Sequence, residues 1–287
     1  MSASPQYRLV QLKNGVHSVH SIAHAETFHP VVGPVAEAEA LYVRQLDLPA
    51  RLRKHQGEFV IWDVGLGAAA NVLTVLRAIS GIEATVRVVS FDHTLEPLEF
   101  ALRHQEALGY FAGYAEAASE LLRAGLVLFD QPSQAIKWEL HRGDFPTLIA
   151  SPSEHPFPAP HAILFDAFSP AKNPAMWTLP LFTQIFRRLD PARPCALPTY
   201  SRSTLLRVSL LLAGFFVGAG HATGEKEETT IAANTIELID DPLDGRWLAR
   251  VRRSNSAEPL HRPIYRQAPL SDDSWEKLQE HPQFRRG

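Results

Sequence analysis

Short apolar runs that lead into an acidic residue recur along the chain, and this pattern constrains the fold most strongly. Residues 59–63 and 162–166 end in Asp63 and Asp166, and residues 85–91 are followed by Asp92. We predict that these runs are buried strands, since their lengths are typical of strands. Apolar periodicity predicts helices at 68–79, 96–108, 179–189 and 205–212. The alternation predicts an α/β fold with a Rossmann-like, doubly wound and mostly parallel sheet.

The flanking segments predict an N-terminal extension (1–55), a central domain (56–244) and a C-terminal tail (245–287). Residues 7–21 indicate a hairpin closed by a two-residue type I′ turn at Asn14-Gly15. A helix is expected over 34–54, with Pro34 in its first turn, and final antiparallel strands over 229–239. The tail is expected to be irregular and basic, packed on the domain, with a short helix from about 272 to 280.

Composition excludes some classes of protein. The chain has 287 residues and a formal net charge of −3, so it is not coated in basic charge, although a local basic patch is compatible with that value. Six arginines against one acid within 246–266 indicate such a patch. The single cysteine, Cys195, excludes an intramolecular disulfide and cysteine-rich zinc sites. No apolar segment fits a signal peptide or a membrane span, so a cytoplasmic protein is expected.

Four histidines gather near the N-terminus and raise the question of a metal site. They are His17, His20, His24 and His29. Their spacing alternates along a strand and then enters a loop, and no set of carboxylates or cysteines completes a ligand sphere. We therefore expect no metal.

A glycine-containing turn follows the first apolar strand. It reads DVGLGAAAN from Asp63 to Asn71 and opens the next helix. Gly65 and Gly67 would let the backbone turn sharply and approach a ligand. The N–H groups at the start of the helix would suit an anionic group such as a carboxylate. An ordinary tight turn would explain the same residues.

Two further acids stand where strands end. Asp92 is placed to accept both hydroxyls of a ribose, as in Rossmann sites, with Glu96 as a competing candidate one helical turn later. Asp144, in Gly143-Asp144, could hold an adenine amino group, and a simple turn is an equally good explanation.

The densest constellation is FDAFSPAKNPAMW, from Phe165 to Trp177. Two prolines and several small residues favour a rigid loop at the end of a strand, with Asp166 at its mouth. A loop without function rarely combines an acid, Lys172, Asn173 and Trp177 so closely. We expect this segment to carry the chemistry.

Together these motifs resemble the MnmC-like family of tRNA 5-methylaminomethyl-2-thiouridine methyltransferases, over about residues 17–266. The match rests mainly on the segment 165–177, which is similar to the family pattern D-x-F-A-P-x-K-N-P-x-M-W. Weaker matches are DVGLGAAAN, Phe91-Asp92, Arg142–Asp144, Thr199–Ser201, Leu206-Arg207, Ala213–Phe215, Gly224–Glu228, Arg253-Ser254 and Pro263–Arg266.

The resemblance implies a Rossmann-like methyltransferase that uses S-adenosyl-L-methionine and methylates 5-aminomethyl(-2-thio)uridine at the wobble position of the tRNA anticodon loop. It implies a catalytic role for Asp166, Lys172 and Asn173. The cofactor would be bound by Asp63, Gly65, Gly67, Asn71, Asp92, Asp144 and Asp166. The substrate would be bound by Phe168, Trp177, Lys226 and Arg253, since unstacked bases are read by aromatic side chains. Packing in the core would also explain both aromatic residues.

Some residues depart from the family pattern. Ala69-Ala70 replaces the third glycine, and the basic G-x-K-R-E has become Gly224–Glu228 with acids in place of cations. This change favours an alternative, a methyltransferase of the same fold that acts on a small-molecule or protein amine. A second alternative is a nucleoside- or RNA-binding module without activity, which would leave Asp166 and Lys172 without a role. No segment resembles an FAD oxidase, so we expect methyl transfer only.

Overall fold

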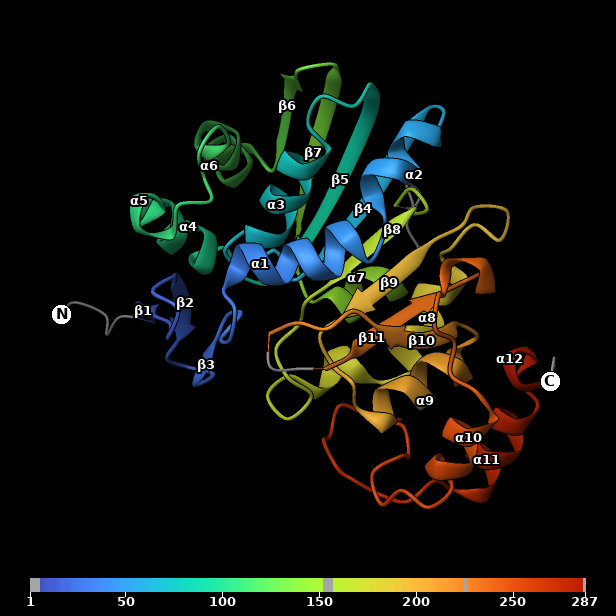
Figure 1. Ribbon diagram of the computed structural model, residues 1–287. Coiled ribbons are helices and arrows are strands. Elements are labelled where there is room, and N and C mark those ends of the chain that lie inside the picture. Colours follow the sequence, from blue (N-terminus) through green and yellow to red (C-terminus); the bar gives the residue numbers. More distant parts are fainter. Residues whose placement is uncertain (1–5, 152–156, 225–226, 286–287) are drawn as a thin grey trace. The chain divides into compact units, whose positions relative to one another are not determined.

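The computed structural model describes residues 6–151, 157–224 and 227–285. They fall into two compact units, whose elements Figure 1 colours along the chain. The first unit holds the described residues up to Asp144, together with Leu164–Asp166 and those between Ala222 and Glu227. The second unit holds the other described residues. The domain boundaries near residues 55 and 244 follow from composition and stay predictions.

The first unit is built from two sheets and their helices. The small sheet has the order β1 (Tyr7–Gln11), β2 (His17–Ser21) and β3 (Glu26–Thr27). The strands of the central sheet in this unit are β4 (Glu58–Val64), β5 (Ala84–Asp92), β6 (Leu126–Gln131), β7 (Gln134–Arg142) and the end of β8 (Ala162–Phe165). The helices are α1 (Pro34–Ala38), the π-helix η1 (Glu39–Arg44), α2 (Leu48–Lys54), α3 (Ala70–Ile79), α4 (Glu96–Arg103), α5 (Gln105–Leu108) and α6 (Ala115–Ala124).

The central strands of this unit follow the order β8-β4-β5-β7-β6. β4 is parallel to β5, and β5 is parallel to β7, whereas β6 is antiparallel to β7. The chain thus moves from β4 to β5 on one side and returns later to β8 on the other side. Strand order reverses beside β4, and α/β sheets bind their ligands at such a point. The prediction of a Rossmann-like, mostly parallel α/β fold is confirmed.

Burial explains why β4 has no polar face. Every residue from Phe59 to Val64 is buried, including Asp63. A parallel strand covered on both faces favours such a continuous apolar run. α3 is buried almost all round, because it packs against α1, η1 and α2.

The second unit continues with short strands and helices. Its strand order is β10 (Phe216–Gly220), β11 (Thr229–Ala233), β9 (Ala196–Thr199) and β8. β8 and β9 are parallel at Ala162 and Ala196, and the other two pairs are antiparallel. The helices are α7 (Phe145–Ala150), η2 (Pro174–Trp177), α8 (Leu179–Arg187), α9 (Thr204–Ala213), η3 (Ile236–Leu238), α10 (Gly245–Val251), α11 (Asp272–Gln279) and α12 (Pro282–Arg285). No helix within the described ranges is long and apolar enough to cross a membrane.

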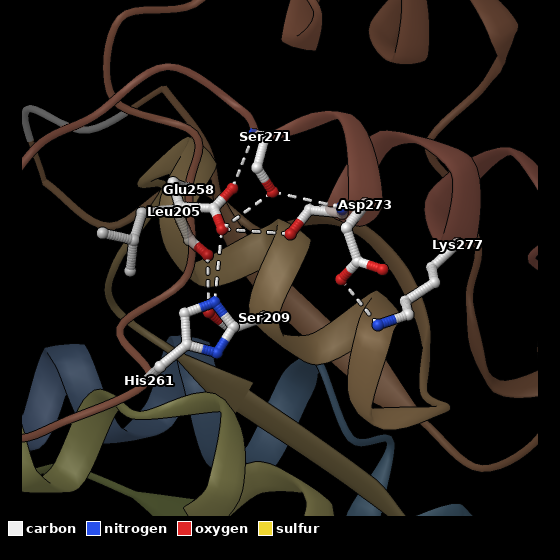
Figure 2. A network of polar contacts seen from close by, with 8 residues as sticks. Leu205, Ser209, Glu258, His261, Ser271, Asp273 and Lys277 are labelled. Atoms are coloured by element: carbon white, nitrogen blue, oxygen red, sulfur yellow. Dashed lines mark hydrogen bonds and ion pairs between the residues drawn. The ribbon is translucent and has the colours of Figure 1, made fainter.

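A buried carboxylate anchors the C-terminal tail. Figure 2 shows Glu258 at the centre of a polar network with His261 and Ser271. Ser274 also donates to this carboxylate. Its Oε2 accepts a hydrogen bond from the Ser271 N–H at 2.8 Å, and its Oε1 accepts from the hydroxyls of Ser271 and Ser274, each at 3.1 Å. These bonds fix the start of α11, whose N-cap is Ser271. The tail also contains α10, which composition did not indicate.

The structure corrects the predicted turn of the N-terminal hairpin. Gly15 has a φ of +85° but Asn14 has a negative φ, whereas a type I′ turn needs positive values at both residues. The Leu12 N–H bonds to the Val16 carbonyl at 2.8 Å, and the Gly15 N–H bonds to the Leu12 carbonyl at 2.9 Å. The turn is therefore a three-residue loop with glycine in the left-handed position.

Two predicted helices are interrupted. The expected helix over 34–54 begins at Pro34 but passes through the π-helix η1 and breaks at Asp47, which has a φ of +46°. The expected helix over 96–108 divides into α4 and α5 at His104. Apolar periodicity continues through both breaks, so it could not reveal them.

Candidate active site

The glycine turn between β4 and α3 depends on backbone conformations that side chains disfavour. Gly65 has a φ of +91° and Gly67 a φ of +52°, both in the left-handed region. The Gly65 and Leu66 N–H groups donate to the Phe91 carbonyl at 3.0 and 3.3 Å, which ties the turn to the end of β5. A Cβ at Gly67 would lie 3.2 Å from Cε2 of Phe28. Glycine therefore allows the N-terminal segment to approach the turn closely.

Asp92 holds the same turn from the end of β5. Its Oδ2 accepts a hydrogen bond from the Gly67 N–H at 2.8 Å, and its Oδ1 accepts from the Thr94 N–H at 3.1 Å. His93 Nδ1 lies 3.3 Å from Oδ1, and this hydrogen bond raises the pKa of His93. The side chain of Asp92 is 9% exposed. Oδ2 can accept a second bond, so Asp92 retains capacity for a ribose hydroxyl.

Asp166 lies at the carboxyl end of β8, next to the end of β4. Its N–H donates to the Val64 carbonyl at 3.0 Å. Its carboxylate accepts a hydrogen bond from Asn71 Nδ2 at 2.7 Å, so Asp166 is tied to the first turn of α3. Asn71 is buried, and its Oδ1 has no hydrogen-bond partner among the described residues. The Asp166 side chain keeps 18% of its surface exposed, which leaves it reachable.

Sequence reasoning missed two residues at this place, His29 and Glu37. His29 Nε2 lies 3.6 Å from Asp166 Oδ2, and His29 Nδ1 lies 3.6 Å from Glu37 Oε1. The side chains of His29 and Glu37 are 7% and 9% exposed. The available signal was weak, because His29 stood among four histidines and its carboxylate partner is distant in sequence.

Asp63 is the most deeply buried acid of this group. Its Oδ2 accepts a hydrogen bond from the Ser90 hydroxyl at 2.7 Å, and Trp138 Nε1 donates to that hydroxyl at 2.9 Å. Burial raises the pKa of Asp63 to about 7, against the effect of the Ser90 bond and with added repulsion from Asp92 and Asp166. Three acids thus crowd the carboxyl ends of β4, β5 and β8.

Most of the other predicted site residues are more exposed than the acids at the ends of β4, β5 and β8. Asp144 is exposed, and it adds to the negative charge that raises the pKa of His93. Lys172 is exposed and Asn173 is half-buried, and both their N–H groups donate to the Ser169 carbonyl at 2.8 Å. Arg253 is exposed at the end of α10, and Lys226 lies outside the described residues.

The two predicted aromatic residues differ. Trp177 is fully buried, donates from Nε1 to the Phe168 carbonyl at 2.8 Å and packs edge-on against Tyr200. It therefore stabilises its loop and presents no free face to a base. Phe168 is half-buried and stays the candidate for stacking.

The N-terminal histidines bind neighbouring hydroxyls. His20 Nδ1 lies 2.8 Å from Thr27 Oγ1, and His24 Nδ1 lies 3.1 Å from Ser21 Oγ. Across the described ranges, no group of three or more His, Cys, Asp and Glu side chains is arranged to hold a metal ion.

The residues around the glycine turn fit an adenosyl-methionine group. No side chain in the described part of the chain caps the first N–H groups of α3, which suits a carboxylate there. The unpartnered Asn71 Oδ1 and the spare acceptor site on Asp92 Oδ2 suit amine and hydroxyl donors. Several carboxylates also suit a positively charged sulfonium.

Comparisons with known proteins agree with this fold. Residues 116–235 match the family described as S-adenosyl-L-methionine-dependent methyltransferase. The bifunctional tRNA 5-methylaminomethyl-2-thiouridine biosynthesis protein MnmC of Aeromonas hydrophila is 30% identical, over 75% of this chain and 34% of that protein. MnmC of Methylibium petroleiphilum is 28% identical, over 81% of this chain and 35% of that protein. The chain thus spans about a third of the length of these relatives.

A solved structure covers nearly the whole chain. The crystal structure of MnmC2 from Aquifex aeolicus superposes with a TM-score of 0.67 and 22% identity, over 98% of this chain and 84% of that one. At this identity the likeness establishes the fold.

The fold, the glycine turn and the family match define the class: the chain belongs to the S-adenosyl-L-methionine-dependent methyltransferases. Within that class it is related to the methyltransferase part of MnmC.

Proposed function

We propose that the protein transfers a methyl group from S-adenosyl-L-methionine to the primary amine of 5-aminomethyl(-2-thio)uridine at the wobble position of tRNA. The observation that carries the proposal is Asp166, which is bound by Asn71 of the glycine turn and yet keeps exposed surface. Such a carboxylate can contact an acceptor beside the cofactor. The relationship to MnmC supplies the substrate class.

The acceptor amine must be neutral when it attacks. An alkyl ammonium has a pKa of roughly 10, like lysine, so it has to lose a proton on binding. S-adenosyl-L-methionine supplies the methyl group on a sulfonium. Asp166 would accept hydrogen bonds from the amine, orient its lone pair and help to remove the proton.

Exposed arginines of the tail support binding to RNA. They are Arg246, Arg250, Arg253, Arg262 and Arg266. Arg252 is committed elsewhere, because it forms a 2.6 Å ion pair with Asp272 and lies over the Trp275 ring. Glu228, which matches the final acid of the family pattern, pairs with the buried Arg207 at 3.2 Å within the second unit. The acid that replaces the arginine of the pattern is Glu227, which is exposed.

The test is transfer of labelled methyl to tRNA that carries 5-aminomethyluridine, with the same tRNA lacking the aminomethyl group as the control. We expect methylation of the first only. Asp166→Asn keeps the size and removes the charge, so transfer should fall by about a hundredfold or more, with S-adenosyl-L-methionine affinity nearly unchanged. tRNA binding should weaken steeply as salt rises and weaken further in Arg253→Glu.

Two outcomes would contradict the proposal. Equal labelling of both tRNAs, or of neither while a free amine is methylated, would favour the small-molecule or protein acceptor. Turnover of Asp166→Asn equal to that of the wild type would remove Asp166 from the mechanism.

A further inference from the structure

His29 is held between two carboxylates that come from different elements. Its Nε2 faces Asp166 after β8, and its Nδ1 faces Glu37 in α1, each at 3.6 Å. The imidazole is 7% exposed, so water screens neither contact well. Both contacts are ion-pair distances, too long for hydrogen bonds, and a doubly protonated ring would direct positive charge toward both carboxylates at once.

The backbone at His29 is strained and its neighbour Phe28 is held by hydrogen bonds, which limits the positions open to the His29 ring. His29 has a φ of +50°, which costs a non-glycine residue about 1 kcal/mol or more. Its neighbour Phe28 is fixed on both backbone groups, since its N–H donates to the Val19 carbonyl at 2.8 Å and its carbonyl accepts from the Ser18 hydroxyl. The Phe28 ring rests against Gly67 of the glycine turn. Such strain persists where surrounding contacts over-determine it, and it gathers at functional sites.

The charges around His29 favour its protonated form. Burial alone would lower the pKa of His29, but the Asp166 and Glu37 carboxylates outweigh burial and hold the pKa above its ordinary 6.5. Asp166 in turn stands near Asp63, and the two repel each other. A cation at this place offsets the crowding of acids.

We propose that His29 is a positioning residue for Asp166, a buried imidazolium that keeps this carboxylate ionised and oriented toward the acceptor amine. This inference rests on the proposed function, because it assigns His29 a role through Asp166. Without the cation, crowding by the neighbouring acids would favour protonation of Asp166. A protonated Asp166 could no longer stabilise or deprotonate an ammonium. Glu37 adds a second carboxylate beside the ring, 3.6 Å from Nδ1.

The first experiment needs no substrate. The ring of His29 is titrated by NMR in protein with labelled histidine, and His29→Gln identifies its signal. We expect a midpoint above 6.5 in the wild type, and lower midpoints in Asp166→Asn and in Glu37→Gln. A midpoint at or below 6.5, or one that Asp166→Asn leaves unchanged, would overturn the proposal.

The second experiment follows turnover against pH. In His29→Gln, the acid limb of the pH profile of turnover should move to higher pH. At a pH on that limb, methyl transfer should fall by about tenfold for each pH unit of the move. The ratio of wild-type to variant turnover should shrink toward one as pH rises past the NMR midpoint of His29, because the wild type loses the same charge there. A ratio that stays constant across pH would mean that His29 only supports the fold.

Matched variants keep these outcomes distinct. His20→Gln, in the same hairpin, removes a histidine that bonds to Thr27 rather than to a carboxylate, and it should leave turnover unchanged. If His29→Gln fails to fold, Glu37→Gln carries the same test, because it removes one of the two stabilising charges and keeps the ring. If tRNA is not methylated, the proposed function fails, while the NMR midpoints still decide whether His29 and Asp166 are coupled.

Discussion

Two buried carboxylates in this molecule have opposite environments. Asp63, at the end of β4, has one hydroxyl donor in Ser90 and stands near two other acids, and burial raises its pKa to about 7. Glu258, in the tail, is also subject to burial, but hydrogen bonds from Ser271, His261 and Ser274 outweigh it and lower the pKa of Glu258 (Figure 2).

The difference separates two uses of buried charge. A carboxylate that receives several donors is ionised and anchors structure, as Glu258 does for α11. A group of acids with few donors opposes ionisation and so costs stability, a cost that persists where ligand chemistry needs those acids. We therefore propose that the tail network is structural and that the acids around the glycine turn are functional.

The largest expected effect tests the structural half of the comparison. Glu258→Gln places an amide group against donors from Ser271 and Ser274, so the free energy of unfolding should fall by about 2 kcal/mol. Chemical denaturation measures this loss. Methyl transfer per folded molecule should remain at the wild-type level.

A neighbouring pair gives the control. Asp273 and Lys277 form an ion pair at 2.6 Å in the same helix, but both side chains are mostly exposed. Asp273→Asn should change stability by no more than about 0.5 kcal/mol. If Glu258→Gln instead lowered turnover and left stability intact, the comparison would fail.

Features that depend on residues close together in the sequence could be predicted. The buried strands β4, β5 and β8 and the acids at their ends were predicted, because apolar runs and strand-terminal acids are visible along the chain. The pairing of Asp166 with His29 was not, since it depends on segments far apart in sequence. The density of motif residues around Trp177 favoured a binding role, yet the indole is buried and bonded to its own loop.

The turn of the hairpin shows a different limit. Asn14-Gly15 is compatible with two loop lengths, and strand register decides between them. That register pairs Gln11 with His17, which leaves a longer loop than a two-residue turn provides. The breaks at Asp47 and His104 likewise depend on packing.

The second prediction sharpens the functional half. Asp92→Ala should weaken S-adenosyl-L-methionine binding by at least about tenfold, or 1.4 kcal/mol, because it removes both the acceptor for ribose and the bond that shapes Gly67. Calorimetry on folded protein measures the affinity. Glu96→Ala removes an exposed acid one turn away and should leave the affinity unchanged. Equal losses in both variants would indicate a general charge effect and would reject the specific role of Asp92.

The smallest effect is the pH dependence of stability at Asp63. Its pKa is 3.8 in the unfolded reference and about 7 in the fold. As pH rises from 4 to 7, the unfolded chain ionises this group freely while the fold resists, so stability falls across that window and levels above it. Asp63→Asn removes this loss. The difference in unfolding free energy between Asp63→Asn and the wild type should therefore rise by about 1 kcal/mol from pH 6.5 to pH 8.

This prediction is decided by how the difference in unfolding free energy changes with pH, and its size at any one pH does not decide it. Loss of the Ser90 bond shifts the Asp63→Asn curve equally at every pH, so it cannot imitate the rise. Glu258→Gln provides the contrast, because the pKa of Glu258 is lowered from 4.5 and its stabilisation is lost only as pH falls below that range. Its difference from the wild type should stay flat between pH 5 and pH 8. A flat curve for Asp63→Asn as well would mean that Asp63 is ionised in the fold like Glu258, and the two regions would then hold their carboxylates in the same way.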